Sequence, residues 1–191
     1  PEYKRARYLG RVYQDPMMGT SAGMEIEENL ALAVRRGKRH TLRLGIRRSE
    51  REDYRRRLKE LGLGLEDRLT TKVGTLSGGQ RQALTLLMAT LQRPKLLLLD
   101  EHTAALDPQT AARVMDLTDR LVQENHLTTL MITHNMRDAI RYGNRLLMLH
   151  NGRIVLDISG EEKARLTVAD LMDMFRKVSG REYDNDRTLL A

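Results

Sequence analysis

Apolar and polar positions follow two different periods along the chain, and the period changes near Pro94. Before Pro94, apolar residues recur at helical spacing, which predicts three helices over Met24–Val34, Ser49–Leu61 and from after Ser77 to about Leu91. After Pro94, short apolar runs alternate with helical patterns. This order predicts a helical block followed by the alternating strands and helices of an α/β sheet.

The second predicted helix has both a start and a stop signal. Ser49 is a suitable N-cap, and Glu52 three residues later would complete a capping box. Gly62 then marks the end of the helix.

The strands are predicted from short apolar runs bounded by turn residues. Tyr8–Gln14 forms a strand that stops at Asp15-Pro16, and Leu96–Leu99 is the continuous run expected of a central parallel strand buried on both faces. Later elements are predicted, in order, as helix Pro108–Gln123, strand Thr129–Thr133, helix Met136–Tyr142, strands Arg145–His150 and Arg153–Ile158 joined by a hairpin at Asn151-Gly152, and helix Thr167–Phe175.

Composition narrows the class of protein. The chain has 191 residues, 40% of them hydrophobic, which fits one globular domain. It contains no cysteine, so disulfides, thiolate metal sites and cysteine nucleophiles are excluded. Neither a membrane-spanning apolar run nor a secretory signal is visible, and we expect a cytosolic chain.

The net charge of +7 is concentrated in one segment. Residues 35–57 contain eleven basic and three acidic residues, so this segment carries 11 − 3 = +8 and the remainder carries −1. A positive net charge suggests nucleic acid or an anionic membrane surface as a partner. Because the positive charge is concentrated in residues 35–57, the sequence instead indicates a neutral body with one basic patch.

Leu76–Gln80 has the sequence of an anion site. Gly78 and Gly79 expose backbone N–H groups, Ser77 adds a hydroxyl, and the following helix adds the partial positive charge of its N-terminus. The alternative is a serine cap after a glycine turn, without any ligand.

Polar residues also end two predicted strands. Asp100 and Glu101 follow four leucines, at the strand end where ligands bind in open α/β sheets. One carboxylate can serve Mg²⁺ and the next can orient an attacking water. His134 ends the next strand and is expected at the same edge, although a lone histidine is more often structural.

Together these motifs resemble those of the ATP-binding subunits of ABC transporters. The matching segments, in chain order, are Gln14 (Q-loop), Leu76–Gln80 (signature), Leu96–Asp100 (Walker B), Glu101 (catalytic glutamate), Ala105–Asp107 (D-loop) and His134 (switch histidine). The resemblance implies a partial P-loop NTPase sheet with an inserted helical subdomain. Its expected domains are a catalytic core at 1–22 and 93–160, a helical signature subdomain at 23–92, and a C-terminal helix and tail at 161–191.

The resemblance also implies roles for these residues, with ATP and Mg²⁺ as cofactors. Asp100 and Gln14 would hold Mg²⁺, Glu101 would polarise the hydrolytic water, and His134 would contact the γ-phosphate. The signature would contact ATP held by a second subunit in a head-to-tail dimer, through Ser77, Gly78, Gly79 and Gln80, with Asp107 linking the two sites.

Two departures from the family pattern stand out. No G-x-x-x-x-G-K-[ST] segment occurs in these residues, so the Walker A loop is missing. We therefore expect a truncated chain that is inactive alone. His102 stands where most family members have proline, and we expect it to alter the loop more than the chemistry.

The resemblance is closest to bacterial importer subunits for amino acids or related small solutes. It implies a second ATP-binding subunit, a transmembrane permease and, indirectly, a substrate-binding protein as partners, at the cytoplasmic face of the membrane. No nucleic acid is expected. The basic segment 35–57 is either a solvated helical lobe or a contact with the permease and anionic lipid. The alternative function is a non-transport ABC ATPase that acts on ribosomes or DNA.

Overall fold

The computed structural model describes residues 2–38 and 45–177, and the chain divides into two compact units, Pro1–Ile132 and Thr133–Ala191. The first unit is built on a parallel sheet in the order β1-β2-β3. Its strands are β1 (Leu9–Val12), β2 (Leu96–Asp100) and β3 (Thr129–Ile132). The central position of β2 and the parallel pairing confirm the predicted α/β class.

The sheet buries one of its two faces within the first unit. Val12, Leu97 and Leu99 are almost fully buried. On the opposite face Leu130 and Ile132 remain 50% and 53% exposed. Within β2 itself Leu97 and Leu99 are buried, but Leu96 and Leu98 on the other face are only half-buried. The expectation that β2 is buried on both faces is therefore wrong for the described part of the chain.

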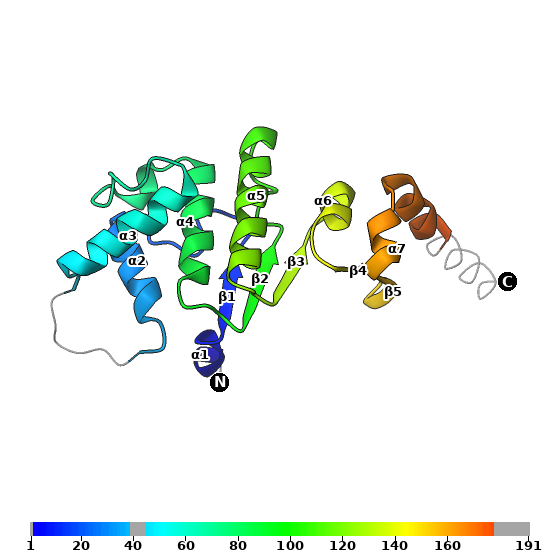
Figure 1. The fold of residues 1–191 in the computed structure, drawn as a ribbon, viewed down its shortest axis with the longest axis horizontal. Helices are drawn as coiled ribbons and strands as arrows, with labels where there is room; N and C mark the ends of the chain where they lie inside the picture. The colour runs from blue at the N-terminus through cyan, green and yellow to red at the C-terminus, as the bar shows by residue number, and fades with distance from the viewer. Residues whose placement is uncertain (1, 39–44, 178–191) are drawn as a thin grey trace. The chain divides into compact units, whose positions relative to one another are not determined.

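A helical lobe is inserted between β1 and β2. It contains α2 (Ile26–Arg35), α3 (Arg48–Leu61), the short 3₁₀ turn η1 (Val73–Thr75) and α4 (Gly78–Thr90). Figure 1 shows α2 and α3 on one side of α4 and α5 (Pro108–Glu124) on its other side, next to the sheet. Their apolar faces share one core with β1 and β2, so the lobe and the sheet of the first unit form a continuous hydrophobic interior.

The start of α3 differs from the sequence prediction. Arg47, not Ser49, is the N-cap, and its backbone N–H donates to Glu50 Oε2 at 2.8 Å. Glu50, and not Glu52, is the capping-box glutamate. Its carboxylate also accepts from Arg35, so one side chain satisfies the helix end and forms an ion pair. The predicted end is confirmed, since Gly62 adopts a left-handed φ of 67°.

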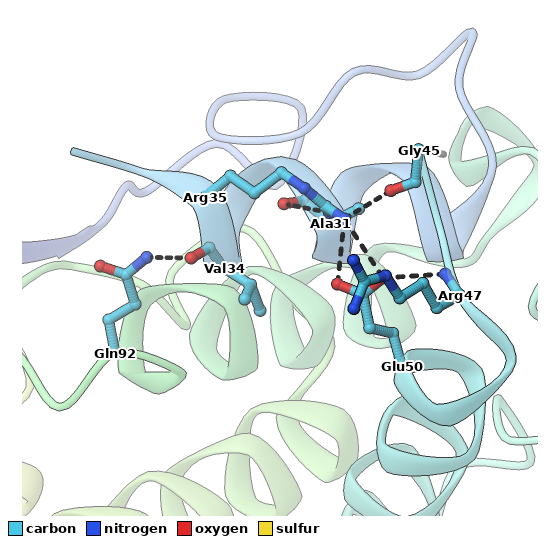
Figure 2. A network of polar contacts seen from close by, with 7 residues as sticks. All are labelled: Ala31, Val34, Arg35, Gly45, Arg47, Glu50 and Gln92. Atoms are coloured by element: carbon cyan, nitrogen blue, oxygen red, sulfur yellow. Dashed lines mark hydrogen bonds and ion pairs between the residues drawn. The ribbon is translucent and has the colours of Figure 1, made fainter. Parts of the chain in front are cut away.

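The basic segment is partly neutralised by acidic side chains of the helical lobe, three of them in the segment itself and one, Glu27, on α2. Arg35 bridges α2 and α3: it donates to Ala31 O at 3.1 Å and pairs with Glu50 at 2.9 Å (Figure 2). Further ion pairs are described for Arg48, Arg51, Arg56 and Arg57. Arg39 and Arg43 lie outside the described residues. These pairs give part of the patch a structural role within the lobe.

The second unit consists of small elements that pack together. It contains α6 (Met136–Arg141), β4 (Arg145–His150), β5 (Arg153–Ser159) and α7 (Gly160–Arg165), and is helical again over 168–177. The hairpin prediction is confirmed, because Asn151 and Gly152 both have positive φ, at 47° and 76°. The sequence pattern missed α7, and in the first unit it missed α1 (Glu2–Ala6) and η1.

Over residues 2–38 and 45–177, none of the helices combines the length and apolar character needed to cross a bilayer.

Candidate functional site

The candidate anion site lies at the exposed start of α4. Ser77 is the N-cap: its Oγ accepts from the Gln80 N–H at 3.3 Å, and Gln80 Oε1 accepts from the Ser77 N–H at 3.2 Å. The serine-cap interpretation is therefore correct as local structure. It leaves the helix end available, because Ser77 and Gly78 are exposed and the first amide groups of a helix lack intrahelical partners.

Gly79 has a packing role that sequence reasoning did not identify. It is buried, and a Cβ added to it would lie 2.1 Å from Thr110 Cγ2 at the start of α5. Only glycine fits this contact. Asp107, the N-cap of α5, accepts from the Thr110 N–H at 3.0 Å. Hydrogen bonds from Thr110 lower the pKa of Asp107, which keeps its carboxylate charged. The starts of α4 and α5 are thus locked together.

Two buried side chains of α4 hold the surrounding loops. Arg81, 5% exposed, donates to the carbonyls of Val73 and Gly74 at 3.1 and 3.0 Å, which fixes the turn before the signature. Gln82, fully buried, donates to Tyr13 O at 2.9 Å and so ties the segment before Gln14 to α4. The sequence signal for both was weak, because polar residues on a helix usually face solvent.

The carboxylate edge of the sheet is less tightly held. Asp100 ends β2 with a side chain that is 41% exposed, and its Oδ2 accepts from Arg11 Nη2 at 3.2 Å. Gln14 lies two residues past the end of β1 and is exposed. Because β1 and β2 are parallel neighbours, Gln14 and Asp100 both follow strand ends at the same edge.

Glu101 occupies an unusual backbone conformation. Its φ is 44°, in the left-handed region that non-glycine residues rarely adopt. Two backbone hydrogen bonds hold it there, from the Glu101 N–H to Ile132 O at 3.0 Å and from the Ala104 N–H to Glu101 O at 2.9 Å. Arg93, His126 and Asn151 share this conformation, so it fixes the direction of the chain after β2 without by itself marking a functional site.

His102 is a buried support beneath this edge. It is 2% exposed, and its Nε2 lies 3.0 Å from Thr118 Oγ1 on α5. The Thr118 hydroxyl donates to Val114 O at 2.7 Å, so Nε2 must carry the hydrogen and donate to it. Burial lowers the pKa of His102 to about 4, which keeps the ring neutral.

The chemistry of the edge fits a magnesium ion. Mg²⁺ takes oxygen ligands, usually one or two carboxylates completed by water and phosphate oxygens. Asp100 offers a half-exposed carboxylate, and Gln14 offers an amide oxygen. Within the described residues no cluster of three or more His, Cys, Asp or Glu side chains forms, so a dedicated all-protein cage is not built there.

The described structure brings together only some of the predicted site residues. The signature and Asp107 meet through Gly79 and Thr110, and Gln14, Asp100 and Glu101 share a sheet edge. His134 follows β3 but belongs to the second unit, so its contact with a γ-phosphate stays a prediction.

Comparison with known families finds a match. A model of the ABC transporter family matches residues 3–104, which include the Q-loop, the signature and the Walker B strand.

Two similar proteins are named for transport. A tyrosine transport ATP-binding protein of Clostridioides difficile (strain R20291) is 48% identical over 174 residues, which are 91% of this chain and 69% of that protein. An aliphatic sulfonates import ATP-binding protein, SsuB 1 of Paraburkholderia xenovorans (strain LB400), is 45% identical over 114 residues, 60% of this chain and 33% of that protein.

Among solved structures, a dimeric ATP-binding cassette, MJ0796, in a post-hydrolysis state bound to ADP and Pi has a similar fold. The TM-score is 0.66 with 26% sequence identity, over 83% of this chain and 65% of that chain. The chain thus spans about two thirds or less of the proteins described here.

Proposed function

This chain belongs to the ABC transporter family, whose ATPases drive transport by hydrolysing ATP, and on that premise we propose that it acts within the ATP-binding subunit of a bacterial importer. The subunit hydrolyses ATP in a head-to-tail dimer. The main support is one arrangement within the first unit: an exposed helix start carrying Ser77 and Gly78, and a sheet edge carrying Asp100 and Glu101.

The two parts suit different halves of a split site. The start of α4 offers backbone N–H groups and a hydroxyl to an anion, but Ser77, Gly78, Gly79 and Gln80 supply no metal ligand or base. The sheet edge supplies the acids. In the proposed dimer, the signature of one subunit contacts the γ-phosphate of ATP held by the other, and Asp107 lies between the two sites.

The residues at the sheet edge have separate tasks. Asp100 and Gln14 hold Mg²⁺, which neutralises phosphate charge when bound. Glu101 orients the attacking water and accepts its proton, and His134 contacts the γ-phosphate. Phosphoryl transfer needs positioning and charge neutralisation more than covalent help, which suits this set of side chains.

The proposed cargo is an amino acid or a related small solute, carried by a permease that receives it from a substrate-binding protein. The relative named for tyrosine transport supports an amino acid over the sulfonates of the shorter match. We place the subunit at the cytoplasmic face of the membrane. Since both relatives have transport names, they favour transport over action on ribosomes or DNA.

The test is ATP hydrolysis by the subunit that carries this chain. Glu101→Gln should lower the turnover rate by about 100-fold, since it removes a general base. Glu124→Gln, at the exposed end of α5, is the matched control and should keep the full rate. Equal rates for Glu101→Gln and the control would refute the assignment of Glu101.

A further inference from the structure

Arg11 is a charged residue on the open, mostly apolar face of the sheet. With Asp100 it lines a depression of 290 Å³ whose other walls are Leu98, Leu99, Leu130 and Ile132. The family motifs give this arginine no task. The guanidinium is half-exposed, and the register of the sheet places one carboxylate within its reach.

Strand pairing explains why Arg11 meets Asp100. Arg11 is opposite Leu98 in β2, and Asp100 lies two residues further along β2, on the same face. The two are therefore diagonal neighbours, and Arg11 Nη2 donates to Asp100 Oδ2 at 3.2 Å. Their side chains are 50% and 41% exposed, and an ion pair this exposed contributes little to folding. A contribution to folding stability therefore does little to explain why an arginine is present at this position.

The guanidinium also has a second contact. Its Cζ lies 4.4 Å from the centre of the Tyr13 ring, within range of a cation–π interaction. Tyr13 directly precedes Gln14, and its carbonyl is held by Gln82 of α4. The backbone at Tyr13 is therefore held, and its ring offers the guanidinium a second contact beside the carboxylate.

We propose that Arg11 is a positioning residue that competes with the divalent cation for Asp100 and thereby sets the metal concentration at which the site fills. The inference rests on the proposed function, because it matters only if Asp100 holds Mg²⁺. A single carboxylate carries one negative charge, and Arg11 already balances it. A divalent ion on the same carboxylate adds two positive charges that repel the guanidinium. Removing the guanidinium should therefore tighten metal binding by about tenfold.

The test uses Mn²⁺ as the probe, with unbound Mn²⁺ measured by electron paramagnetic resonance. The protein is the subunit that carries this chain, saturated with a non-hydrolysable ATP analogue. Arg11→Met should lower the Kd for Mn²⁺ by about tenfold, whereas Arg11→Lys, which keeps the charge, should stay within about threefold of wild type. Affinity for the analogue without metal should not change in either variant.

The matched control is Arg55→Met, which removes the same charge from an exposed position on α3 and should leave the Kd unchanged. An equal or weaker Mn²⁺ affinity in Arg11→Met than in the control would overturn the inference. Arg11→Gln repeats the comparison if Arg11→Met does not fold.

Asp100→Asn separates this inference from the proposed function. It should raise the Kd for Mn²⁺ whether or not Arg11 competes. If Asp100→Asn leaves the Kd unchanged, the metal assignment itself fails. If Asp100→Asn weakens binding but Arg11→Met does not tighten it, the inference about Arg11 fails and the metal assignment stands.

Discussion

The two functional regions of the first unit are held in opposite ways. The signature corner, formed by the starts of α4 and α5, is fixed by a capping box, a second N-cap and the close contact of Gly79 with Thr110. The carboxylate edge is held at Asp100 by one half-exposed ion pair. The part proposed to reach across to a second subunit is preformed by its own chain, whereas the part proposed to bind metal keeps its ligand adjustable.

This contrast matches what each region must do. A surface that docks on a partner gains affinity when it is already ordered, because less entropy is lost on binding. A metal ligand must exchange partners as the ion and nucleotide come and go. The firm element beneath the carboxylate edge is His102, which is buried against α5.

The largest predicted effect is at Gly79. Gly79→Ala places a Cβ 2.1 Å from Thr110 Cγ2 and should lower the free energy of unfolding by about 3 kcal/mol, measured by urea denaturation. Thr110→Ser removes the obstructing methyl, so the double variant should recover most of the loss. Gly78→Ala is the control: its Cβ would be 3.4 Å from Leu106 Cδ2, and its stability should stay near wild type. Equal stability of the two alanine variants would show that the corner is not locked.

The next effect tests the support beneath the carboxylate edge. Burial lowers the pKa of His102 to about 4 in the folded chain, below the ordinary histidine value of 6.5, so the unfolded chain binds the extra proton more readily. Stability should therefore fall as the pH drops from 6.5 towards 4, by about 2 kcal/mol between pH 7 and pH 5. Urea denaturation at both pH values measures this loss. His102→Gln should remove most of it, and an undiminished loss in that variant would count against the assignment.

A smaller effect compares Ser77, which caps α4 in the structure, with Ser49, which the sequence predicted as the cap of α3. Ser77→Ala removes the acceptor of the Gln80 N–H and should lower the free energy of unfolding by about 1 kcal/mol. Ser49→Ala should change it by less than about 0.5 kcal/mol, because Ser49 lies inside α3 and is exposed. Thermal or urea unfolding of the two variants is the measurement. A larger loss at Ser49 would restore the cap that the sequence suggested.

The sequence predicted local features well and long-range contacts poorly. The apolar run of β2, the hairpin at Asn151-Gly152 and the end of α3 at Gly62 each depend on neighbouring residues, and all are confirmed. The start of α3 was wrong because Glu50 is also engaged by Arg35, fifteen residues away.

The unpredicted parts of the site depend on contacts between distant segments. Arg11 and Asp100 are 89 positions apart and meet only through the register of β1 with β2. Gly79 reads as a phosphate-binding glycine in sequence, and its contact with Thr110 depends on how α4 packs against α5. The burial of His102 likewise follows from tertiary packing, which periodicity does not encode.

The central claim is that the preformed corner of one subunit contacts ATP held by another. The most direct measurement is sedimentation of the subunit that carries this chain, in the Glu101→Gln background, with ATP and Mg²⁺. We predict a dimer for Glu101→Gln. Gly78→Asp added to it should stay monomeric yet still bind ATP, because the new carboxylate is tolerated at the start of α4 but repels phosphate. An ATP-dependent dimer of equal strength in the double variant would contradict the split-site account.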